Sequence, residues 1–179
     1  MHPDLQKILL TENQIRSRVT EVAKLVDKAL SGKRPVAVGI LKGSIIFYAD
    51  FIRCLTVPLE LDFMAVSSYG AGSVSSGKLK IRKDLDGDVR GRDIVVIEDI
   101  IDSGFTLACL KKLLTERGAA SVTIVTLLDK HERRTEDIKP DYNCFEIPDE
   151  FVVGYGLDYN EEYRSLPYIG ILKRSVYEK

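Results

Sequence analysis

Residues 94–107 decide the fold of this 179-residue chain, and they read Ile94-Val95-Val96-Ile97-Glu98-Asp99-Ile100-Ile101-Asp102-Ser103-Gly104-Phe105-Thr106-Leu107. The four β-branched residues at the start predict a strand buried on both faces, as in the middle of a parallel sheet. Two carboxylates stand where that strand is expected to end, and a short polar turn and a helical spacing follow. This order places side chains at the carboxyl edge of a sheet, where open α/β sheets bind ligands.

The turn and the acidic pair each suggest a ligand. Backbone N–H groups at the start of the helix, around Ser103 and Gly104, form a natural seat for a phosphate. The carboxylates of Glu98 and Asp99 are suited to holding sugar hydroxyls or a hard metal ion.

Composition excludes several classes of protein. The 26 basic residues nearly cancel the 27 acidic ones, so charge gives no sign of a nucleic-acid or anionic-membrane partner. No apolar run approaches the ~20 residues of a membrane span, and no secretory signal is visible. The scattered thiols Cys54, Cys109 and Cys144 favour a reducing compartment over disulfides or zinc. We therefore expect a cytoplasmic protein.

Strand and helix patterns alternate along the chain. Thr11 to Gln14 has the form of a capping box and opens a helix that Gly32 closes, and Ser44 is the candidate N-cap of a second helix over 45–54. Other strands are predicted at 36–41, 59–65, 78–82, 122–128, 144–147 and 151–153. This alternation predicts an α/β fold, with a central, mostly parallel β-sheet flanked by helices. We expect one domain over 1–179, with its core at about 35–138 and a small hood from 1–12 and 139–179.

Residues 67–77 are rich in Ser and Gly, which predicts a mobile segment. The sequence alone leaves open whether it is a lid over a site or a solvated hairpin loop. Gly72, Gly77 and Lys78 nearly match a phosphate-binding P-loop. The match fails at Leu79, where a hydroxyl should meet magnesium, and a strand pattern follows in place of a helix.

Charged residues also follow two other buried strands. Lys42-Gly43 comes after 36–41 and Asp129-Lys130 after 122–128, and each alone also fits an ordinary turn. Because the carboxyl ends of parallel strands meet at one edge of a sheet, their convergence with the acidic pair favours a ligand site there.

The stretch Ile97–Thr106 resembles the phosphoribosyl-pyrophosphate (PRPP) signature of the type I phosphoribosyltransferases, and further motifs follow in family order to the C-terminus. In detail the chain is similar to the hypoxanthine-guanine members of that family. The resemblance implies the type I phosphoribosyltransferase fold and a glycosyltransferase of purine salvage. In that reaction the 5-phosphoribosyl group of PRPP passes to N9 of hypoxanthine or guanine with the help of Mg²⁺, giving IMP or GMP and pyrophosphate. A homo-oligomer, either a dimer or a tetramer, is also expected.

The resemblance also implies a role for each site residue. Asp102 is the catalytic base, and the 5-phosphate is bound by Asp102, Ser103, Gly104, Phe105 and Thr106. Glu98 and Asp99 hold the ribose and the metal, with Asp158 near a second metal ion. Pyrophosphate is bound by Lys42, Gly43 and Arg164, and the peptide before Lys42 is often cis in the family. The purine is bound by Ile100, Lys130, Phe151, Val152 and Asp158, and Ser68 and Tyr69 belong to a flexible lid.

Other functions stay open at this point. A nucleotide-sensing, RNA-binding regulator on the same fold would need a basic face, which the charge balance does not indicate. A P-loop nucleoside kinase is disfavoured by Leu79. Within the transferases, xanthine, adenine or a pyrimidine is an alternative base.

Overall fold

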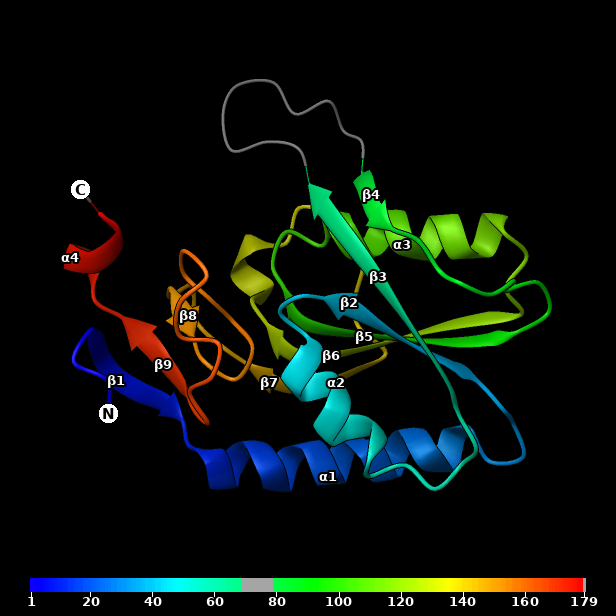
Figure 1. The fold of residues 1–179 in the computed structure, drawn as a ribbon, viewed down its shortest axis with the longest axis horizontal. Coiled ribbons are helices and arrows are strands. Elements are labelled where there is room, and N and C mark those ends of the chain that lie inside the picture. Colours follow the sequence, from blue (N-terminus) through cyan, green and yellow to red (C-terminus); the bar gives the residue numbers. More distant parts are fainter. Residues whose placement is uncertain (69–78, 179) are drawn as a thin grey trace.

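The computed structural model describes residues 1–68 and 79–178 of the chain. Its elements in chain order are β1 (Leu5–Leu10), α1 (Glu12–Ala29), β2 (Val36–Leu41), α2 (Ile45–Ile52), β3 (Glu60–Ser68), β4 (Leu79–Lys83), β5 (Asp93–Ile101), α3 (Phe105–Glu116), β6 (Ser121–Asp129), the 3₁₀ helix η1 (His131–Arg133), β7 (Tyr142–Glu146), β8 (Val152–Val153), β9 (Ile169–Leu172) and α4 (Arg174–Tyr177) (Figure 1).

The main sheet has six strands in the order β4-β3-β2-β5-β6-β7. Every neighbouring pair is parallel except β3 and β4, which are antiparallel. The predicted central strand is confirmed: β5 lies between β2 and β6, and residues 94–97 are at most 1% exposed. The expected mostly parallel α/β sheet is therefore present.

Helices cover both faces of this sheet. Side chains of α1 and α2 share one apolar cluster with Val95 and Ile97, and side chains of α3 share another with Ile94 and Val96. Alternate residues of β5 thus enter opposite layers, because successive side chains of a strand point to opposite faces. Figure 1 shows α1 and α2 below the sheet and α3 above it.

The predicted start of α1 is confirmed in detail. Thr11 is the N-cap, and its hydroxyl accepts from the N–H of Gln14 while the Gln14 side chain accepts from the N–H of Thr11 at 2.9 Å. We expect Thr11→Ala to lower the free energy of unfolding by about 1 kcal/mol, since it leaves helix N–H groups without their partner. Chemical denaturation measures this loss. Thr115→Ala, an exposed Thr inside α3, is the matched control and should change stability less.

Two local predictions are wrong. Ser44 precedes α2 but does not cap it, because its backbone is already helical (φ −74°, ψ −8°) and its hydroxyl donates to the carbonyl of Ile40 at 2.6 Å. The central strand does not end before Glu98, because β5 continues to pair with β6 as far as Ile101, which lies opposite Asp129. The acidic pair therefore belongs to the last residues of the strand itself.

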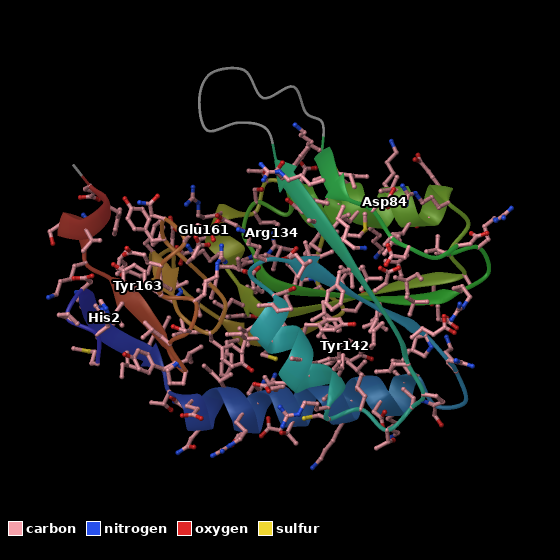
Figure 2. All side chains as sticks on the ribbon, in the orientation of Figure 1. His2, Asp84, Arg134, Tyr142, Glu161 and Tyr163 are labelled. Atoms are coloured by element: carbon pink, nitrogen blue, oxygen red, sulfur yellow. The ribbon has the colours of Figure 1, made fainter. Side chains whose placement is uncertain are left out.

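A second, antiparallel sheet joins the two ends of the chain, in the order β1-β9-β8. Figure 1 shows it beside the carboxyl ends of the main strands, with β9 next to β1. The rings of His2 and Tyr163 meet edge to face there, with centroids 5.1 Å apart (Figure 2). Strand β1 was not predicted from the sequence. Strand β7 falls within the range 139–179 expected for the hood, but it pairs with β6 in the main sheet.

The Ser/Gly-rich segment connects β3 to β4 at the edge of the main sheet, and residues 69–78 lie outside the described part of the chain. The predicted lid residue Tyr69 is among them, and Ser68 is described only as the last residue of β3. The structure confirms that a strand follows Lys78, whereas a P-loop leads into a helix. None of the described helices is long and apolar enough to cross a membrane.

Candidate active site

A cavity of about 380 Å³ opens where the main strands end. It is lined from β2, β3, β5 and the start of α3 by Ile40, Leu41, Gly43, Val66, Ser67, Glu98, Asp99, Ile100, Ile101, Asp102, Ser103, Gly104, Thr106 and Leu107. The acidic pair and most of the turn after it thus face one space, as the order of residues 94–107 predicted.

Within the acidic pair, Glu98 is buried and Asp99 is half-buried. Glu98 is 8% exposed, and its Oε1 accepts a hydrogen bond from the N–H of Asp99 at 3.3 Å. Asp99 Oδ1 accepts a hydrogen bond from the N–H of Ile100 at 2.8 Å. Burial raises the pKa of Glu98 well above its usual range, and the negative charge of Asp99 adds to the rise. Burial also raises the pKa of Asp99. A positive charge placed beside the pair would therefore be strongly stabilised.

This donor set fits Mg²⁺ that arrives with a phosphorylated substrate. In the described residues no group of three or more His, Cys, Asp or Glu side chains is placed to hold a metal ion. Mg²⁺ usually takes only one or two protein carboxylates, together with water and substrate phosphate oxygens. Glu98 and Asp99 supply that number of carboxylates within the cavity.

The turn before α3 forms an anion seat. Gly104 is the N-cap of α3 with φ +86°, and a Cβ there would lie 2.7 Å from Ile138 Cγ2 and 2.8 Å from Arg134 Cδ, so only glycine fits. The N–H groups in the first turn of a helix have no partner within the helix and lie at its positive end. The N–H of Phe105 donates to Ser103 Oγ at 3.3 Å. Ser103, Gly104 and Thr106 of this turn line the cavity, so a helix N-terminus of the kind that binds phosphate lies at its wall.

Asp102 carries an unused acceptor. Its Oδ1 is buried and, among the described residues, has no hydrogen-bond partner, although Arg133 Nε lies 3.4 Å away as an ion pair. Its carbonyl accepts from Arg134 Nε at 3.0 Å, which fixes the backbone of the turn. A buried carboxylate oxygen without a hydrogen bond is costly, so it indicates a proton or donor that a ligand supplies.

The loop after β2 is held between the acidic pair and the chain near Gly156. The peptide between Leu41 and Lys42 is cis, as the resemblance implies. A Cβ on Gly43 would lie 1.7 Å from Asp99 Oδ2, and a Cβ on Gly156 would lie 2.0 Å from the carbonyl oxygen of Gly43. Both positions therefore require glycine, and the backbone of this loop lies directly against the carboxylate of Asp99.

One carboxylate bridges the two predicted pyrophosphate-binding cations. Glu161 Oε1 lies 2.9 Å from Lys42 Nζ, and its Oε2 lies 3.0 Å from an Nη of Arg164 (Glu161 is labelled in Figure 2). These two cations hold the pKa of Glu161 below its usual value. Asp158 Oδ1 is 2.8 Å from the same Arg164 nitrogen. Lys42 and Arg164, 122 residues apart in sequence, thus converge on one anionic group.

The predicted purine-binding residues come from both sheets, with Ile100 in β5 and Val152 in β8. Lys130 is only 7% exposed, and its Nζ is 3.7 Å from Asp149 Oδ1. Phe151 keeps 36% of its surface exposed, and Val152 is buried in β8. Ile100 lines the cavity, whereas several predicted residues lie outside its described lining: Lys42, Phe105, Lys130, Phe151, Val152, Asp158 and Arg164.

Residues 6–160 match a model of the phosphoribosyl transferase domain. The chain belongs to the phosphoribosyltransferase family. It is 54% identical over 178 residues to the hypoxanthine-guanine phosphoribosyltransferase of Bacillus subtilis, covering 99% of both chains. It is 53% identical over 175 residues to that of Lactococcus lactis, covering 98% of this chain and 95% of the relative. A crystal structure of a Staphylococcus aureus hypoxanthine phosphoribosyltransferase has a TM-score of 0.96 at 49% identity, with 100% of this chain and 97% of that chain covered.

These comparisons confirm the family and the fold expected from residues 97–106. The roles of individual residues stay predictions. Sequence reasoning missed Glu161 as the partner of Lys42 and Arg133 as the partner of Asp102. Only the Glu161–Arg164 pair has a local signal, since opposite charges three residues apart can meet within a turn. The other pairs join distant segments and leave no pattern in the sequence.

Proposed function

We propose that this phosphoribosyltransferase acts in purine salvage, transferring the 5-phosphoribosyl group of PRPP to N9 of hypoxanthine or guanine. The products are IMP or GMP and pyrophosphate. The observation that carries the proposal is the cavity in which a helix N-terminal turn meets the acidic pair Glu98 and Asp99. The names of relatives that are about half identical over nearly the whole chain support the choice of bases.

The ribose 5-phosphate part of PRPP would occupy the cavity. The N–H groups of the turn Ser103–Thr106 bind the phosphate, and the carboxylates of Glu98 and Asp99 accept from the ribose hydroxyls. The same two carboxylates would hold Mg²⁺, which neutralises charge on the pyrophosphate when it is bound. A second ion at Asp158 is part of the proposal, although both carboxylate oxygens already have partners, Arg164 and the N–H of Glu161.

The leaving group would be neutralised by two cations. Breaking the bond from C1′ to the pyrophosphate builds positive charge on the ribose and negative charge on the leaving oxygen. Lys42 and Arg164 already lie on either side of one carboxylate, that of Glu161, so their spacing suits an anion between them. Gly43, the residue after Lys42, lines the cavity and adds backbone groups to the same site. Donors fixed in advance around developing charge lower the barrier most efficiently.

The proton of the purine would pass to Asp102. As N9 attacks C1′, the ring loses the proton on N7, and Asp102 Oδ1 is a buried acceptor that no described donor occupies. Arg133 Nε lies 3.4 Å from the same oxygen as an ion pair. The lid role of Ser68 and Tyr69, which would exclude water during the reaction, stays a prediction.

Lys130 would select 6-oxopurines, because an ammonium offers only donors and the amino group of adenine is also a donor. We expect Lys130→Gln to lower the rate with hypoxanthine about 10- to 100-fold, which is the equivalent of losing a hydrogen bond from a charged group. The variant should also show a smaller preference for hypoxanthine over adenine. Nucleotide formation from both bases measures this. Lys139→Gln, at an exposed lysine, is the matched control. Equal rates of the unmodified enzyme with adenine and hypoxanthine would refute the assignment.

The deciding experiment incubates the protein with Mg²⁺, PRPP and each nucleobase in turn and measures nucleotide and pyrophosphate. We expect IMP from hypoxanthine and GMP from guanine, with little product from adenine, xanthine or pyrimidines, and no product after EDTA removes the metal. Product from another base would correct the specificity. Salt-dependent binding of RNA without turnover would support the regulator in place of the enzyme.

Location and assembly are further parts of this proposal. The three cysteines are free thiols, which suits the cytoplasm. The exposed apolar side chains of Ile45 and Leu61 suit contact between copies in a dimer or tetramer. Light scattering after size-exclusion chromatography measures the number of copies.

A further inference from the structure

Phe151, the predicted stacking partner of the purine, is held by two other aromatic rings. The ring of Tyr177 stacks on it with centroids 4.8 Å apart and planes 24° apart, and the ring of Tyr159 meets it edge to face at 5.6 Å and 88°. Phe151 is still 36% exposed. The Tyr177 ring therefore covers one face of the Phe151 ring, and the part of Phe151 that stays exposed is open to a ligand.

Tyr177 comes from the far side of the hood. It is the last residue of α4, which Figure 1 shows at the end of the small sheet away from the main sheet.

Backbone and packing contacts fix α4 in this place. The N–H of Lys173 donates to the carbonyl of Asp4 at 3.0 Å, and the N–H of Leu172 donates to the carbonyl of Phe151 at 2.8 Å. Val176 and Tyr177 pack on the apolar cluster of the small sheet. The hydroxyl of Tyr177 makes no hydrogen bond within the described ranges, so the ring itself is the functional part of this side chain.

We propose that Tyr177 is a positioning residue for the purine, because it fixes the plane of the Phe151 ring on which the base stacks. The inference rests on the proposed function. A half-exposed Phe otherwise moves between rotamers, and a base that binds to it must stop that motion. The stacked and edge-on rings remove this freedom before the base arrives.

The test is steady-state kinetics of the full chain with hypoxanthine and PRPP. We expect Tyr177→Ala to raise KM for hypoxanthine about three- to tenfold, while kcat and KM for PRPP change less than about twofold. Tyr177→Phe keeps the ring and should restore the original KM, whereas Tyr177→Leu keeps apolar volume without a flat ring and should not. A change in kcat and both KM values together would mean a merely structural role and would overturn the inference.

A double-mutant cycle with Phe151→Leu separates this inference from the function on which it rests. Phe151→Leu should raise KM for hypoxanthine, and adding Tyr177→Ala should then have no further effect. An equal effect of Tyr177→Ala in both backgrounds, or a lowered KM in the single variant, refutes the positioning role while the proposed function stands. If Phe151→Leu leaves KM unchanged, the stacking role of Phe151 fails, and the inference fails with it.

Discussion

Asp102→Asn is expected to lower turnover at least about 10²-fold, because the amide cannot take the proton that leaves purine N7. The change keeps the size of the side chain, and the carbonyl of residue 102 can still accept from Arg134. Nucleotide binding should therefore persist. Initial rates with hypoxanthine and PRPP measure the first effect, and equilibrium titration with IMP measures the second.

Asp137→Asn is the matched control for this variant, since it makes the same chemical change at an exposed carboxylate close by in sequence. It should leave turnover unchanged. Near-normal turnover of Asp102→Asn would remove Asp102 as the base. Loss of IMP binding together with turnover would instead mean that its carboxylate mainly organises the turn.

Gly43→Ala is expected to lower kcat/KM roughly 10²-fold, because a shift of about 1 Å at a site can cost that much. The new methyl carbon would lie 1.7 Å from Asp99 Oδ2 and 2.7 Å from its Cγ. Either the loop or the acidic pair must therefore move. Since Asp99 is expected to hold ribose and metal, the loss should include a weaker apparent affinity for PRPP and Mg²⁺.

Gly87→Ala is the control, since a Cβ there meets nothing within 4 Å. It should retain full activity and a similar melting temperature. If Gly43→Ala also retains full activity, the acidic pair is free to move without consequence, and its assignment to the ribose and metal is wrong.

Local patterns predicted most of the fold. The capping box at Thr11 and the β-branched run 94–97 depend on neighbours in sequence, so the sequence alone identified them. Strand β1 was missed because its partner β9 lies about 160 residues away and because two register irregularities interrupt the pairing, so no regular alternation marks it. The cap at Ser44 was wrong because the side chain has a nearer acceptor, the carbonyl of Ile40.

The site was predictable where it consists of strand ends. Glu98, Asp99 and the turn after them line one cavity because parallel strands share a carboxyl edge. The partners of these groups were not predictable. Glu161 and Tyr177 come from the last fifth of the chain, and their contacts with Lys42 and Phe151 exist only after the hood has folded beside the main sheet. Only the distances between these residues in the folded protein show that they are partners.

If Lys42 and Arg164 bind pyrophosphate as proposed, the carboxylate of Glu161 makes substrate binding an exchange of anions. Lys42 and Arg164 are already paired before substrate binds, because the carboxylate of Glu161 neutralises part of their charge. If pyrophosphate binds there as proposed, it must displace Glu161 on arrival, and Glu161 can return as it departs. The measured affinity for PRPP is then a difference between two ionic interactions, and added salt weakens both of them. A built-in counter-anion of this kind favours rapid release of a highly charged product over the tightest possible binding.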